Sequence, residues 1–264
     1  MIDTHCHLNF HAFKDDVENV IKETQTAGVT TIINTGTKLD SSQSAVDLAK
    51  QYDNLYAIVG IHPHHADKLE NGWEETLKHI AKQEKVVAIG EIGLDYFSYR
   101  SNGIADPKVQ KKVFEAQVQL AHELKLPLQI HNRLAGKDIL EILHHHRNLL
   151  QTIPGMFHCF AGSIEILKEI LDLGFYVGFD GNLTYPGLAP EETTMLSELA
   201  KATPPDRIVT ETDSPYLTPI PHRGERNTPA YISLIVEEIA RIKNIPVEEI
   251  AEQTTENAKR LFSL

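Results

Sequence analysis

Histidine and carboxylate side chains recur at the ends of apolar segments in this chain of 264 residues. The first such segment ends in His5 and His7, and alternate side chains of a strand share one face, so both rings point the same way. Four later apolar segments end in further residues of these types, namely Glu91, His131, His158 and Asp213. Imidazole and carboxylate groups are common ligands of transition metals, so this pattern favours metal chemistry.

The alternative interpretation is six unrelated buried polar groups. Burying a carboxylate or an imidazole is unfavourable unless the group is paired or bound to a metal. Six independent occurrences are therefore difficult to reconcile with a stable core, and we expect the six side chains to meet in one metal site. The elements that carry them must then bring the ends of separate segments together.

Short β-rich segments alternate with helical patterns along the chain. Strands are predicted at 2–8, 29–35, 55–61, 86–92, 126–131, 152–160, 175–179 and 207–211. Helices are predicted at 14–27, 41–51, 73–83, 107–124, 136–146, 163–173, 190–200, 228–243 and 246–262. This alternation indicates βαβ units and a parallel sheet, and a doubly wound open sheet is the alternative to a barrel. Eight units and a length near ~250 residues predict one α/β domain over residues 1–264, a TIM-type (β/α)8 barrel whose active site lies at the carboxyl ends of its strands.

The composition limits the compartment and the partners. The net charge is −12, from 25 Lys and Arg against 37 Asp and Glu, so a nucleic acid must be met by a local basic patch. We interpret the two cysteines, Cys6 and Cys159, as packing residues rather than as part of a disulfide framework. We see neither a signal peptide nor a run of ~20 apolar residues. We expect a cytoplasmic protein with no membrane association and no obligate protein partner.

The motifs at the predicted strand ends resemble those of the TatD family of metal-dependent deoxyribonucleases, within the wider amidohydrolase-like barrels. In chain order they read DTHCHL (3–8), GIHPH (60–64), GEIGLD (90–95), IHNR (130–133), FHCF (157–160), ETDSPYL (211–217) and PHRGERNTP (221–229). The resemblance implies a metal site of His5, His7, Glu91, His131, His158 and Asp213. It also implies a deoxyribonuclease that acts 3'-to-5' on single-stranded DNA ends, and that magnesium can support this activity.

The six side chains divide into two expected groups: His5, His7 and Asp213 for one divalent ion, and His131 and His158 for a second. Glu91 is the expected bridge, because a carboxylate has two oxygens. Two ions about 3.5–4 Å apart activate water and stabilise the leaving oxygen of a phosphodiester. Asp213 would orient or deprotonate that water, which makes Asp213 and Glu91 the predicted catalytic residues. Ligand preference favours zinc or manganese over magnesium.

Substrate contacts are expected on the loops around the strand ends. The predicted substrate-binding residues are His62, His64, Arg133, Arg223 and Arg226, with Arg100 as a further cation, because guanidinium groups suit phosphate. Aromatic side chains on the same loops can stack on unpaired bases, with packing as the alternative, and they are Tyr96, Phe97, Tyr185 and Tyr216. The longest interruption, 95–106, suits a substrate lid.

Two other classes of function stay open. The same fold and metals can hydrolyse another ester, a lactone or an amide, including an aminoacyl ester on RNA. A metal-binding protein without turnover is the third interpretation. The presence of Asp213 argues against it, because this residue is the best candidate to accept the proton of the attacking water.

Overall fold

Parallel β-strands form one sheet, and the computed structural model describes residues 1–99 and 103–264. Within these residues the sheet has eight strands in sequence order: β1 (Ile2–Cys6), β2 (Thr31–Thr35), β3 (Leu55–Val59), β4 (Val86–Asp95), β5 (Leu128–Arg133), β6 (Gly155–His158), β7 (Tyr176–Phe179) and β8 (Ile208–Thr210). This confirms the predicted TIM-type (β/α)8 fold.

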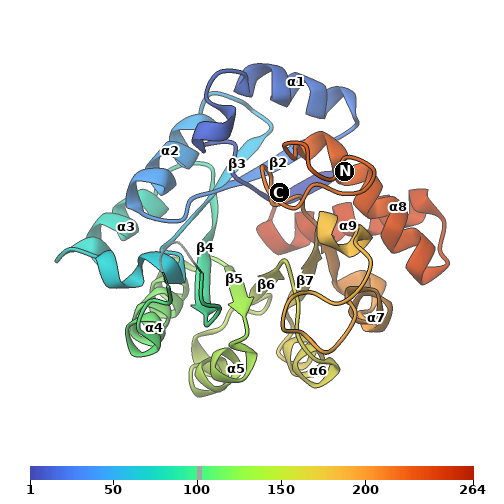
Figure 1. Cartoon of the computed structure of the whole chain (residues 1–264). Coiled ribbons are helices and arrows are strands. Elements are labelled where there is room, and N and C mark those ends of the chain that lie inside the picture. The colour runs from blue at the N-terminus through green and yellow to red at the C-terminus, as the bar shows by residue number, and fades with distance from the viewer. Residues whose placement is uncertain (100–102) are drawn as a thin grey trace.

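Helices alternate with the strands and surround them (Figure 1). They are α1 (Val17–Thr26), α2 (Leu39–Ala49), α3 (Trp73–Ala81), α4 (Pro107–Leu124), α5 (Gly136–His145), α6 (Ile164–Asp172), α7 (Leu196–Ala202), α8 (Ile232–Lys243) and α9 (Val247–Phe262). Across the described residues, no helix combines the length and the apolar composition that a membrane crossing requires.

Side-chain and backbone contacts between β1 and the end of β8 close the barrel. The Thr4 hydroxyl donates a hydrogen bond of 3.0 Å to the Thr210 carbonyl. The buried Asp3 carboxylate accepts from the Thr212 backbone N–H at 3.0 Å and from its hydroxyl at 2.6 Å. A parallel bridge pairs Cys6 with Ser214. These contacts hold the segment after β8 against the end of β1, so residues from the two ends of the chain share one site.

The amino-terminal end of the barrel is filled with apolar side chains. One buried cluster joins residues of the strands with the end of α9, and it contains Ile2, Ile33, Ile58, Ala88, Met156, Tyr176, Val209, Ala258, Leu261 and Phe262. Helix α9 therefore covers this end of the barrel. The buried side chains of His5, His7, Glu91, Asp95 and His158 lie towards the carboxyl ends of the strands, which is the face where barrel enzymes place their sites.

Several predicted boundaries differ from the structure by three residues or more, among them those of β4, α7 and α8. Strand β4 continues to Asp95, three residues beyond its predicted end, and pairs with β5 as far as Arg133. The predicted helix 190–200 is wrong at its start, because α7 begins only at Leu196. The preceding residues include Thr193 and Thr194, and β-branched residues lose side-chain freedom in a helix.

Candidate metal centre

The six residues predicted as metal ligands converge at the carboxyl ends of the strands. His5 lies in β1 and His7 directly follows it, Glu91 and His131 lie in β4 and β5, and His158 ends β6. His131 and His158 are register partners across β5 and β6, which sets them at the same level of the barrel. The sixth, Asp213, follows β8 and lies beside β1 through the contacts that close the barrel.

His5, His7 and Asp213 form the first group of possible metal ligands. The two Nε2 atoms are 3.0 Å apart, and each lies 3.4 Å from Asp213 Oδ1. The opposite nitrogen of each ring is already engaged: His5 Nδ1 faces Gln129 Oε1 at 2.8 Å, and His7 Nδ1 faces the Thr35 carbonyl at 2.9 Å. Both Nδ1 atoms must donate, because each faces an oxygen acceptor.

Neutral rings in these tautomers direct both Nε2 lone pairs towards each other and towards the Asp213 carboxylate. Three acceptors at these distances repel one another unless a shared proton or a metal cation lies among them. Burial alone would lower the pKa of His7, but its contacts with Asp213 raise it, so His7 holds such a proton readily. A group of donor atoms that needs a cation between them also fits a metal ion in that place.

Glu91, His131 and His158 form the second group. Glu91 Oε1 lies 2.8 Å from His131 Nδ1 and 3.4 Å from His158 Nε2. The other oxygen, Glu91 Oε2, lies 3.8 Å from the Nε2 atoms of both His5 and His7. One carboxylate thus turns one oxygen to each group, which is the geometry needed to bridge two ions.

Two carboxylates behind the second group were not predicted as site residues. Asp95 Oδ2 lies 3.1 Å from His131 Nε2. Glu211 Oε2 lies 3.3 Å from His158 Nδ1, although the two atoms are not aligned as a hydrogen bond. Carboxylates in this position orient ligating histidines and increase their basicity. Their signal was present in the sequence, since Asp95 ends the GEIGLD motif and Glu211 begins the ETDSPYL motif.

The electrostatics keep the Glu91 and Asp213 carboxylates ionised. Burial alone would raise the pKa of Glu91, but His62, His158 and His131 around it hold that pKa well below the usual range. The same balance applies to Asp213, whose pKa is lowered by its contacts with His5 and His7. Burial alone would lower the pKa of His131, but hydrogen bonds to Asp95 and Glu91 raise it to about 9.

His62 lies within reach of the second group as a hydrogen-bond donor. Its Nδ1 accepts the backbone N–H of His64 at 3.1 Å, so in the neutral ring Nε2 carries the proton. That N–H points to Glu91 Oε1, 3.4 Å away. Burial lowers the pKa of His62 to about 4, so the ring is neutral at neutral pH. This geometry suits donation to a substrate oxygen better than ligation of a metal.

His64 lies beside the Asp95 carboxylate without an aligned hydrogen bond to it. Its Nε2 lies 3.0 Å from Asp95 Oδ2, and its ring packs edge-on against Tyr99 at 4.6 Å. Asp95 Oδ2 also accepts the Tyr99 hydroxyl at 3.2 Å. His64 therefore lies beside the centre, and a direct substrate contact by His64 stays a prediction.

The predicted phosphate-binding arginines have three different environments. Arg133 ends β5, and its guanidinium lies 4.4 Å from the centre of the Phe97 ring. Arg223 is exposed and lies 4.0 Å from the Tyr185 ring. Arg226 forms a bidentate pair with Asp16 at 2.9 and 2.6 Å, and a phosphate contact by Arg226 stays a prediction. Its guanidinium also donates to the Ala12 carbonyl, so it fastens the segment before α1. Arg100 lies outside the described residues.

The predicted stacking aromatics also differ in availability. Tyr216 is 53% exposed and turns its ring edge towards His7 at 6.4 Å. Tyr96 donates its hydroxyl to Asp138, and Tyr185 donates to the Thr218 carbonyl. Tyr216 thus remains the most accessible ring beside the first group.

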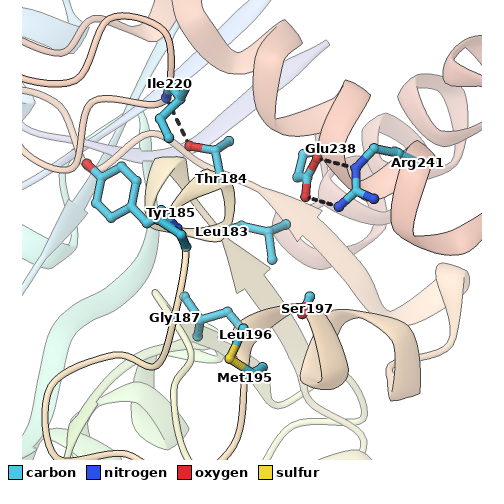
Figure 2. Close-up of a pocket in the computed structure, with 11 residues that line it drawn as sticks. Leu183, Thr184, Tyr185, Gly187, Met195, Leu196, Ser197, Ile220, Glu238 and Arg241 are labelled. Atoms are coloured by element: carbon cyan, nitrogen blue, oxygen red, sulfur yellow. Dashed lines mark hydrogen bonds and ion pairs between the residues drawn. The ribbon is translucent and has the colours of Figure 1, made fainter.

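A separate hollow of about 380 Å³ is lined by the turn that follows β7 and by residues of α7 and α8 (Figure 2). Its cation, Arg241, forms a bidentate pair with Glu238 on the same helix at 2.7 and 2.6 Å. None of its lining residues belongs to the two groups of possible metal ligands. The hollow is therefore distinct from the candidate metal centre.

An eight-stranded parallel barrel with histidine–carboxylate groups at its strand ends defines the class of metal-dependent barrel hydrolases. A family model described as "TatD related DNase" matches residues 2–263. The chain therefore belongs to the TatD family of metal-dependent hydrolases, as the motifs predicted.

Several relatives match along the whole chain. The sequence is 40% identical to an uncharacterized metal-dependent hydrolase, YabD, of Bacillus subtilis, over 100% of this chain and 99% of the relative. It is 35% identical to the "3'-5' ssDNA/RNA exonuclease TatD" of Erwinia tasmaniensis, over 100% of both chains. The crystal structure of YJJV, a TatD homologue from Escherichia coli, superposes with a TM-score of 0.90 at 28% identity, covering 100% of this chain and 98% of that one.

Proposed function

We propose that this chain is a nuclease that hydrolyses DNA phosphodiester bonds 3'-to-5' from single-stranded ends, with two divalent ions bound at the barrel mouth. The single observation that carries the proposal is Glu91, whose two oxygens face two separate groups of possible metal ligands. A relative 35% identical to this chain bears the name of a single-stranded DNA and RNA exonuclease, which supports the same class of substrate.

The residues present fit two ions in charge as well as in position. Glu91, Asp95, Glu211 and Asp213 surround the histidines, and two divalent cations balance four carboxylates. Buried carboxylates without such compensation are strongly unfavourable. His5, His7 and Asp213 would hold one ion and His131 and His158 the other, with Glu91 between them. The imidazole-rich donor set prefers zinc or manganese to magnesium.

The protein side chains divide the work of hydrolysis. When bound, the ions supply positive charge that activates water and stabilises the leaving oxygen. Asp213 is ionised and its side chain is 14% exposed, so it can accept the proton of a water arriving from the mouth. The Nε2–H of His62 can donate to a phosphate oxygen. Arg133 at the end of β5 and the exposed Arg223 after β8 provide the cations that an acidic chain needs to meet a nucleic acid.

A substrate panel tests this function. The purified chain is stripped with a chelator, reloaded with magnesium, manganese or zinc, and given single-stranded DNA labelled at either end, duplex DNA, RNA, a phosphomonoester and an aminoacyl ester. We expect stepwise shortening of single-stranded DNA from its 3' end, abolished by chelator and by Asp213→Asn. Hydrolysis of the aminoacyl ester without nuclease activity under any of the metals would instead establish the rival hydrolase.

A further inference from the structure

Gln129 is a fully buried amide inside the barrel, on β5 two residues before His131. Its side chain fills the space beside Gly90, the residue before Glu91. A Cβ atom on Gly90 would lie only 2.6 Å from the Gln129 Cβ atom, so the glycine makes room for this side chain. A long polar side chain at such a position needs a reason, because burying an amide is unfavourable unless its hydrogen bonds are made.

The hydrogen bonds of Gln129 fix the orientation of its amide. Its Nε2 donates to the Thr4 backbone carbonyl at 2.9 Å, and this oxygen can only accept. The amide oxygen must therefore be the atom that faces His5 Nδ1 at 2.8 Å. The Thr35 hydroxyl donates to the same oxygen at 3.4 Å. Rotating the amide by half a turn would place two carbonyl oxygens against each other at Thr4.

This orientation determines which nitrogen of His5 carries the proton. His5 Nδ1 must donate to Gln129 Oε1, so in the neutral ring the Nε2 lone pair is free and faces His7 and Asp213. Thr35 acts in parallel, since its carbonyl accepts from His7 Nδ1 while its hydroxyl contacts Gln129.

We propose that Gln129 is a positioning residue of the metal centre, which holds His5 in the tautomer that can bind a metal ion through Nε2. The proposal rests on the proposed metal centre, but not on the identity of the substrate. Gln129 itself donates nothing to the ion or the substrate, and its effect passes through His5.

The chemistry of the amide explains why other side chains are poorer at this position. Methionine has a similar length, but it offers His5 Nδ1 no strong acceptor and leaves the Thr4 carbonyl without its donor. Glutamate keeps an acceptor for His5 while losing the donor to Thr4. Loss of a hydrogen-bond partner behind a ligating histidine weakens metal binding by roughly 10- to 100-fold. We therefore expect Gln129→Met to weaken metal binding by this factor and Gln129→Glu to weaken it less.

The test measures metal affinity and the His5 tautomer in the full chain, without any nuclease assay. Zinc affinity is determined by competition with a chromophoric chelator for wild type, Gln129→Met and Gln129→Glu. The matched control is Gln117→Met, which removes another buried amide, one that bonds the Ile61 backbone rather than a metal-group histidine. Long-range ¹⁵N–¹H spectra of the zinc-loaded protein report which ring nitrogen of His5 carries the proton.

We expect Gln129→Met to weaken zinc binding roughly 10- to 100-fold while Gln117→Met leaves it near wild type. The His5 Nδ1–H signal should persist in wild type and in Gln129→Glu. Equal weakening in both methionine variants would reduce Gln129 to a structural role and overturn the proposal. If Gln129→Met does not fold, loss of the Nδ1–H signal in Gln129→Glu overturns it as well. Because wild-type zinc affinity is measured first, an absence of nuclease activity is distinguished from a failure of this proposal.

Discussion

Raising the pH should destabilise the chelator-treated protein in a defined window. His131 lies between Glu91 and Asp95, and its pKa in the folded chain is raised from 6.5 to about 9. A raised folded-state pKa contributes stability that is fully present below 6.5 and is lost as the pH rises through about 9. Each pKa unit corresponds to about 1.4 kcal/mol. The contacts of His131 with Glu91 and Asp95 therefore contribute on the order of 3 kcal/mol to the free energy of unfolding.

The neighbouring histidines do not obscure this window. The pKa values of His158 and His7 are also raised, so their contributions change in the same direction. Those of His5 and His62 are lowered, so they titrate below 6.5, outside the window.

The assay is urea unfolding in the presence of chelator at several pH values from 6.5 to 9. We expect the free energy of unfolding to fall by at least about 3 kcal/mol across this range, because His158 and His7 add to the contribution of His131. Asp95→Asn removes one of the two carboxylates beside His131, so its curve should be flatter. Zinc-saturated protein should also show a smaller fall, because the neutral imidazole is the form that binds metal. A wild-type free energy that changes by less than about 1 kcal/mol with chelator present would refute the assigned ion pairs.

Four substitutions separate the other roles. Arg223→Ala should weaken single-stranded DNA binding and flatten its salt dependence by about 0.7 in slope, measured by fluorescence anisotropy. Arg226→Ala should change neither DNA affinity nor its salt dependence. It should lower the free energy of unfolding by at most about 1 kcal/mol, since the pair of Arg226 with Asp16 is partly exposed. A larger loss of DNA affinity in Arg226→Ala than in Arg223→Ala would contradict the roles given to these two arginines. Glu91→Gln should reduce the bound metal per chain after dialysis, and unchanged content would exclude a bridge. Asp213→Asn should slow turnover by at least about 100-fold, and more than it reduces metal content.

The convergence of the six predicted metal ligands could be predicted from sequence, because each lies in or just after a predicted apolar strand. Parallel strands closed into a barrel bring such ends together, so position along the chain was enough to predict their convergence. The division into two groups around Glu91 was also predictable, because His5 and His7 share one strand. The sequence could not predict which ring nitrogen of His5 or His7 faces the site. That choice depends on hydrogen-bond partners on other strands, such as Gln129 and Thr35.

The contacts that the sequence did not show have a common physical origin, because they join residues far apart in the chain or on different strands. The pair of Arg226 with Asp16 joins residues 210 positions apart in the chain, and no local pattern shows that they meet. Asp95 was visible within a motif, yet its role became clear only when β4 proved to extend to it and to place it beside His131.

The central claim is that the barrel mouth holds divalent ions between these six side chains. Anomalous diffraction from crystals of the chain loaded with manganese tests it most directly. We predict two anomalous peaks on opposite sides of Glu91, one within ligand distance of His5 and His7 and the other of His131 and His158. Peaks elsewhere on the molecule, with none at the barrel mouth, would contradict the account.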